Sequence, residues 1–193
     1  MEAVEVIIAG KEKKDRILSE KEKRIVSFHE VGHALATAVQ KHTQPVHKIT
    51  IVPRTMGSLG YTMQMPEEEE RYLMSKDEIV DQITVFLAGR AAEELVFNVQ
   101  TTGASNDIEK ATKTARAMVT KYGMTKELGC VCYGTDNSNV FLGRDMGRTQ
   151  DYSEATAAKI DELVLKIVNE AYGKATSVLK DNIDKLHDIA AYL

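Results

Sequence analysis

The sequence lacks several features that would place it in a specialised protein class. Its 193 residues include only 3 Pro and 12 Gly, which excludes a collagen-like or proline-rich chain. With only 2 Cys it has no disulfide framework. These two, Cys130 and Cys132, lie too close together in sequence for a zinc-binding C-x-x-C pair. We expect both to be small apolar residues of a strand, in a reducing compartment.

Charge and hydropathy exclude two further classes. Lys and Arg number 25 and Asp and Glu 29, so the net charge is −4 and no basic field attracts nucleic acid. No stretch approaches the roughly 20 apolar residues that span a bilayer. Hydrophobic residues make up 43% of the chain, enough to close a core. We therefore expect a soluble globular chain without a nucleic-acid partner.

Apolar residues at helical spacing predict most of the secondary structure. Two of the helix starts carry a capping box, formed by Ser19 with Glu22 and by Ser75 with Glu78. Two more helices are expected after residue 151, separated by Gly173. The earlier helices are expected over residues 19–41, 75–97 and 106–122.

Extended segments are few and short. Residues 47–53 alternate and are rich in β-branched side chains, and residues 59–65 form a second run, which together predict an irregular hairpin. Residues 129–134 and 140–142 also read as short extended segments. The sequence thus predicts a mainly α fold with a small β-sheet and a C-terminal helical pair.

One motif on the first predicted helix carries chemistry. His29-Glu30-Val31-Gly32-His33 is H-E-x-x-H, and with only 5 His in the chain it is expected far less than once by chance. Residues four apart share a helix face, so His29 and His33 can bind one Zn²⁺ ion. Glu30 can then take a proton from zinc-bound water and pass it to the leaving amine. The remaining histidines lack such spacing and are expected at surface or packing positions: His42, His47 and His187.

A catalytic zinc ion needs a third protein ligand, and the residues leave three candidates. Asp107 lies in the first turn of a predicted helix, directly after a glycine-containing turn. A carboxylate is favoured at that helix end, although first-turn acids are also common without any ligand role. Glu93 and Glu94 lie on a helix, where a glutamate can serve as third ligand. Their alternative role is a solvated face or an ion pair with Arg90.

Several further segments, in order along the chain, accompany this motif. The chain resembles the peptidase domain of FtsH-type ATP-dependent zinc metalloproteases, the membrane-anchored AAA proteases. The resemblance implies a zincin-like helical metalloprotease domain in which Asp107 completes the zinc site. It also implies a structural role for Glu94, or one in orienting a ligand. The matching stretches are residues 19–26, 29–35, 49–53, 59–62, 87–94, 102–112, 140–143 and 152–161.

The resemblance also implies parts that this chain does not contain. There is no G-x-x-x-x-G-K-[ST] phosphate loop, so ATP and Mg²⁺ would act only through an AAA module elsewhere in a longer protein. Residues 1–16 are then expected to be a linker or remnant of that module, and residues 17–193 the peptidase domain. Within it, about 17–150 would be the catalytic part and 151–193 the C-terminal helices. The full-length protein would be a homo-hexamer at the cell's inner membrane, with this domain facing the cytoplasm.

Two functions from different classes fit the sequence. The first is an endopeptidase that hydrolyses unfolded or membrane-extracted polypeptides, with the substrate extended beside residues 59–65. The second is a non-catalytic oligomerisation or interaction module with a vestigial site. The intact set of His29, Glu30, His33 and Asp107 favours the first. A variant of the first is a different zincin that uses Glu93 or Glu94 as a ligand.

Overall fold

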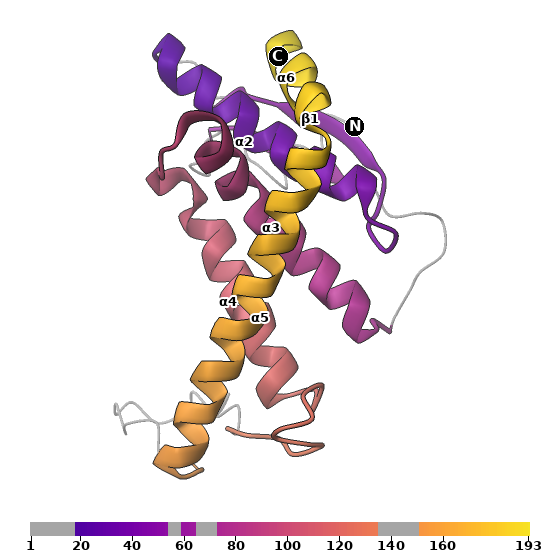
Figure 1. Ribbon diagram of the computed structural model, residues 1–193, viewed down its shortest axis with the longest axis vertical. Coiled ribbons are helices and arrows are strands. Elements are labelled where there is room, and N and C mark those ends of the chain that lie inside the picture. Colours follow the sequence, from indigo (N-terminus) through magenta and orange to yellow (C-terminus); the bar gives the residue numbers. More distant parts are fainter. Residues whose placement is uncertain (1–17, 54–58, 65–72, 135–150) are drawn as a thin grey trace, which may run out of the picture.

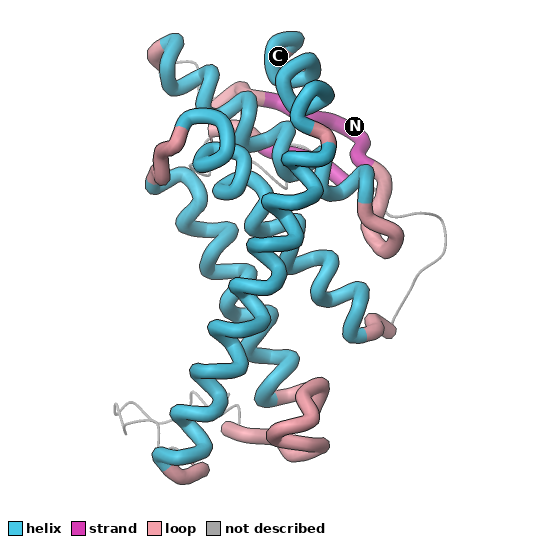
Figure 2. The backbone as a smooth tube through the Cα atoms, viewed as in Figure 1, coloured by secondary structure: helices cyan, strands magenta, loops and turns pink. Residues whose placement is uncertain are grey.

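The computed structural model describes residues 18–53, 59–64, 73–134 and 151–193. The expected linker at residues 1–16 and the extended segment at 140–142 lie outside these ranges. In the described part the chain forms five α-helices, one 3-10 turn and two strands (Figures 1 and 2). No helix there is long and apolar enough to cross a membrane. The elements are α2 (Glu20–Val39), β1 (Val46–Thr50), β2 (Tyr61–Gln64), α3 (Lys76–Phe97), η1 (Thr102–Ala104), α4 (Ser105–Thr120), α5 (Glu154–Asp181) and α6 (Ile183–Tyr192).

Both capping boxes form as the sequence predicts. Ser19 accepts from the backbone N–H of Glu22 and the Glu22 side chain accepts in return from Ser19, so α2 begins at Glu20. Ser75 and Glu78 do the same at the start of α3. Each box satisfies backbone donors that would otherwise lack partners, and such a cap contributes about 1 kcal/mol.

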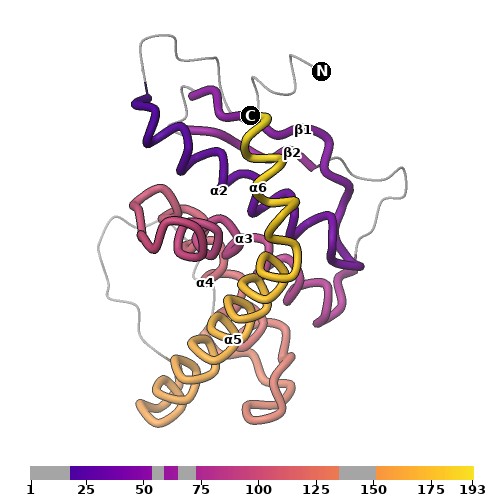
Figure 3. Tube along the Cα trace, turned by 45° about the horizontal axis from the view of Figure 1, so that its top comes forward, coloured from indigo at the N-terminus to yellow at the C-terminus, as the bar shows by residue number. Residues whose placement is uncertain are grey.

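α3 is the central element of the fold. It packs against α2 on one side and against α4 and α5 on the other, and α6 returns the chain to α2. The antiparallel β1–β2 pair covers the other side of α2, as Figure 3 shows. Apolar side chains form two clusters, one joining α2, α3 and the C-terminal helices and the other joining α3, α4 and α5. α3 contributes to both, so it links the two halves of the core.

Three expectations about local structure are wrong. α5 continues through Gly173, and the chain breaks instead at Asn182, because a single glycine costs only about 1 kcal/mol within a helix of 28 residues. Residues 129–134 form no strand. Cys130 and Cys132 lie in this segment and are exposed, so they are not residues of a strand as expected.

Replacing glycine by alanine should change the free energy of unfolding in opposite directions at Gly32 and at Gly173. A Cβ on Gly32 would lie 2.8 Å from the Ala88 carbonyl oxygen and 2.9 Å from Ala92 Cβ, whereas Gly173 has nothing within 4 Å. We expect Gly32→Ala to lower the free energy of unfolding by about 1–3 kcal/mol because α2 and α3 must move apart. Gly173→Ala should raise it by about 0.5–1 kcal/mol. Denaturant unfolding of both variants measures this, and equal effects would contradict the close packing of α2 on α3.

Candidate metal site

The two motif histidines meet on the face of α2 that packs against α3. Their Nε2 atoms lie 3.0 Å apart, and both side chains are nearly buried. Gly89 of α3 lies against both rings, where a Cβ would be 2.5 Å from Nε2 of His29 and 2.6 Å from Nε2 of His33. The bare backbone of α3 therefore gives the imidazole pair the space it occupies.

Asp107 reaches this pair from the first turn of α4. Its Oδ2 lies 3.4 Å from Nε2 of His29 and 3.5 Å from Nε2 of His33. Immediately before it, the Thr101 side chain accepts from the N–H of Gly103 and caps η1, which leads directly into α4. This turn directs the Asp107 carboxylate to the α2 histidines. The residues alone left Asp107, Glu93 and Glu94 open as the third ligand, and the family resemblance pointed to Asp107, which lies beside both histidines.

The trio fits a tetrahedral cation such as Zn²⁺. Nδ1 of His33 lies 2.7 Å from the carbonyl oxygen of Val85, which can only accept, so this nitrogen carries the proton. Nδ1 of His29 lies 2.7 Å from Oε1 of Glu93 and donates to it. In neutral rings both Nε2 atoms then present lone pairs to each other, an arrangement that needs a cation or a proton between them. Ligands at about 2.0–2.1 Å from a tetrahedral zinc ion are about 3.3 Å apart, close to the spacing here.

The two rival glutamates occupy different places. Glu93 is buried, accepts from the backbone N–H of Thr101 at 2.9 Å and pairs with Arg90 at 3.4 Å while it binds His29. It therefore contacts the nitrogen of His29 that faces away from the trio and fixes the orientation of that ring. Glu94 accepts instead from the hydroxyl of Tyr172 on α5, away from the histidines. The orienting role suggested for Glu94 by resemblance belongs to Glu93 by geometry.

Glu30 lies beside the trio and is itself buried. Burial raises the pKa of its carboxyl, against the opposing influence of His33 and His29 and of a hydrogen bond from Thr62. Because burial favours the neutral form, this carboxyl takes up a proton more readily than an exposed glutamate does. Glu30 thus has the environment of a general base placed next to a cation site.

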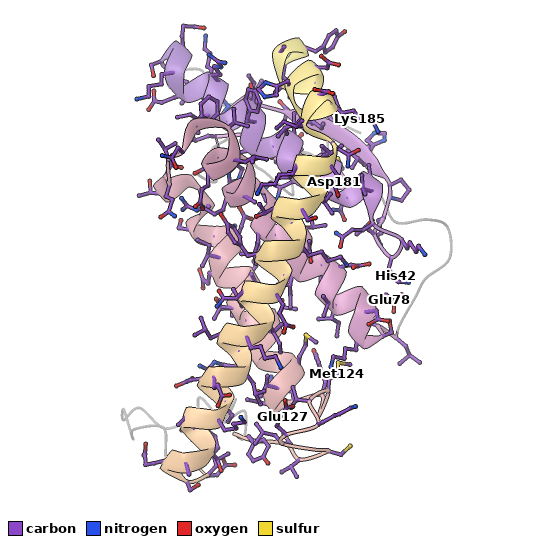
Figure 4. The ribbon with its side chains drawn as sticks, viewed as in Figure 1. His42, Glu78, Met124, Glu127, Asp181 and Lys185 are labelled. Atoms are coloured by element: carbon purple, nitrogen blue, oxygen red, sulfur yellow. The ribbon has the colours of Figure 1, made fainter. Side chains whose placement is uncertain are left out.

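The other histidines lie away from this site. His42 bonds Asp81 of α3 through Nδ1 at 2.9 Å, and Figure 4 shows it beside the N-terminal half of that helix. His187 packs edge-on against Phe28 with ring centroids 5.1 Å apart. His47 is exposed on β1. All three are surface or packing residues, as expected. In the described part of the chain, the one cluster with metal-ligand geometry is His29, His33 and Asp107.

Comparison with known proteins supports the same interpretation. The sequence model of peptidase family M41 matches residues 16–193. The chain belongs to this family. It is 53% identical over its whole length to ATP-dependent zinc metalloprotease FtsH 1 of Thermoanaerobacter sp. (strain X514), of which it covers 31%. The FtsH proteins of Clostridium perfringens and Thermotoga maritima are 56% and 46% identical, and the chain covers 26% and 31% of them. The chain thus spans less than a third of the length of these curated relatives.

Sequence reasoning missed two contributors to this M41 site. It considered Glu93 as a ligand, a solvated residue or an ion-pair partner of Arg90. The ion pair forms, but the contact with His29 was not expected, because a buried carboxylate and an exposed one look alike in a helical pattern. It gave Gly89 no role, since a glycine within a helix shows no sign of what it faces. The signal for both was the spacing, because Glu93 follows Gly89 by four residues and lies on the same helix face.

Zn²⁺ binding at this M41 site should release a proton from His29. Burial lowers the pKa of His29, but hydrogen bonds with Asp107 and Glu93 outweigh it and raise the pKa to about 9. At pH 7 the ring is therefore protonated, and it must lose that proton to bind Zn²⁺. We expect the apparent affinity for Zn²⁺ to rise about tenfold per pH unit between pH 7 and 9 and then to level off. Competition with a chromophoric chelator measures this, and a flat profile would contradict it.

Substituting the adjacent residues Glu93 and Glu94 one at a time tests whether Glu93 orients the His29 ring. Glu93→Gln removes the charge that holds Nδ1 of His29, so we expect the affinity for Zn²⁺ to fall by about 10–100-fold. Glu94→Gln changes the neighbouring residue, whose partner is Tyr172, and should leave the affinity within about twofold. Competition with a chelator measures the affinity of both variants for Zn²⁺. An equal loss of affinity in both would show that the effect does not act through His29.

Proposed function

We propose that this chain is the zinc endopeptidase domain of a longer ATP-dependent protease. His29, His33 and Asp107 would bind the ion and Glu30 would be the catalytic base and acid. The observation that carries the proposal is that three ligand atoms from α2 and α4 converge beside a buried carboxylate. The FtsH relatives, named zinc metalloproteases, support the choice of metal.

In this proposal the chain's own residues position the ion and move protons. The bound Zn²⁺ lowers the pKa of a water molecule to about 7 and polarises the scissile carbonyl. Glu30 accepts the proton of the attacking water and delivers it to the leaving amine. The burial that raises the pKa of Glu30 suits it to both transfers. Asp107 balances part of the charge of the ion.

A substrate would lie extended along β2. β1 pairs with one edge of this strand, and no described strand pairs with its other edge. A peptide added there gains main-chain hydrogen bonds, a mode that reads the backbone more than the side chains. Weak sequence specificity and a preference for unfolded or membrane-extracted polypeptides follow from this mode.

The larger assembly is a further part of the proposal. The relatives are named ATP-dependent, and most of their length lies outside the part that matches this chain. We propose that residues 1–16 connect to an AAA ATPase module, that residues 17–193 form the peptidase domain, and that ATP and Mg²⁺ act only in that module. A homo-hexamer anchored in the inner membrane, with this domain facing the cytoplasm, completes the arrangement that the resemblance implies.

Replacing the base tests the mechanism apart from metal binding. We expect Glu30→Gln to keep one Zn²⁺ per chain and to lose about 10²–10⁴-fold of the wild-type rate on an unfolded protein such as casein, because the amide cannot take a proton. Asp107→Ala is the matched variant that should lose the metal, whereas Glu94→Ala should keep it. Elemental analysis and cleavage assays measure these outcomes.

Three results would contradict the proposal. Equal cleavage by zinc-loaded wild type and Glu30→Gln would overturn the role of Glu30. Full zinc content in Asp107→Ala would overturn the ligand set. Zinc binding without any cleavage by the wild-type chain would favour a non-catalytic interaction module.

A further inference from the structure

We propose that Thr62 is a positioning residue that holds the Glu30 carboxylate for catalysis, so that the strand expected to bind substrate also orients the base. The inference rests on the proposed function and adds a residue to it. It starts from the contacts that Thr62 of β2, a residue outside the H-E-x-x-H motif and outside the ligand set, makes with α2.

Thr62 makes two contacts with the same glutamate. Its Oγ1 lies 2.9 Å from the main-chain oxygen of Glu30 and 3.2 Å from Oε2 of the Glu30 side chain. The hydroxyl has a single proton, which it shares between the two acceptors, so the α2 backbone helps to fix its position beside the carboxylate. Among the described residues, Thr62 is the hydrogen-bond partner found for the Glu30 side chain. The base thus depends on a strand residue 32 positions away in sequence.

Gly60 confines the other oxygen of the same carboxylate. A Cβ on Gly60 would lie 2.9 Å from both Oε1 and Cγ of Glu30, and 2.6 Å from the Thr50 carbonyl oxygen. The backbone at this position can approach Glu30 only because the residue has no side chain. Gly60 lies directly before β2 and Thr62 lies within it, so this one segment approaches both Oε1 and Oε2 of Glu30.

This arrangement links the ordering of β2 to the position of the Glu30 carboxylate. A two-stranded sheet alone is only marginally stable, and a peptide that pairs with the free edge of β2 would order it. An ordered β2 places the Thr62 hydroxyl, and with it the Glu30 carboxylate. Binding along the strand would then increase kcat, because remote contacts help to hold the reacting groups. Loss of the hydroxyl should therefore lower kcat and leave KM nearly unchanged.

The test compares three threonine variants of the zinc-loaded chain on one fluorogenic peptide. We expect Thr62→Val to lower kcat about tenfold with KM within about twofold, and Thr62→Ser to restore most of the rate because it keeps the hydroxyl. Thr50→Val is the matched control in the neighbouring strand, since the Thr50 hydroxyl bonds the N–H of Val52 rather than Glu30. It should retain the wild-type kcat.

A structural measurement separates positioning from general damage. In crystals of zinc-loaded Thr62→Val we expect the Glu30 carboxylate to leave its wild-type position while His29, His33 and Asp107 keep theirs. An unchanged carboxylate, or a wild-type kcat in Thr62→Val while Glu30→Gln is inactive, overturns this inference and leaves the proposed function intact. Full activity in Glu30→Gln would instead overturn the proposed function itself.

Discussion

The structure depends on the meeting of two imidazole nitrogens at the packed face between α2 and α3. Nε2 of His29 and Nε2 of His33 face each other at 3.0 Å, and each ring has its other nitrogen engaged by an acceptor. Two such lone pairs repel unless a positive charge lies between them. The Asp107 carboxylate approaches the same point, and its hydrogen bond with His29 helps to raise the pKa of that ring, which favours a positive charge there. The neighbouring residues described above either orient these three side chains or lie beside them.

Two glycines let α2 and α3 pack closely enough for this arrangement. Gly32 lets α2 approach the backbone of α3 at Ala88, and Gly89 leaves room for both rings. Glu93, held by Thr101 and Arg90, then fixes the ring of His29 from behind. On the opposite side of α2, Gly60 and Thr62 confine Glu30. α3 thus contacts both histidine rings, α4 carries Asp107, and β2 contacts Glu30.

The sequence predicted the parts of this architecture that have a local cause. The two capping boxes fixed where α2 and α3 begin, and the i, i+4 spacing placed both histidines on one face. Asp107 could not be chosen over Glu93 and Glu94 from the residues alone, because that choice depends on how α4 approaches α2. The resemblance to a known family pointed to Asp107, and the fold brings it to the histidines. The break at Asn182 instead of Gly173 was missed because tertiary packing along α5 outweighs the low helix propensity of one glycine.

The position of Asp107 has a consequence for the folded state as a whole. The histidines belong to α2, which packs in one apolar cluster, and Asp107 begins α4, which packs in the other. An ion shared by these three ligands would be a further connection between two sub-cores that α3 and α5 already join. Its binding energy would then stabilise the folded state across both sub-cores, and chelation would remove that contribution.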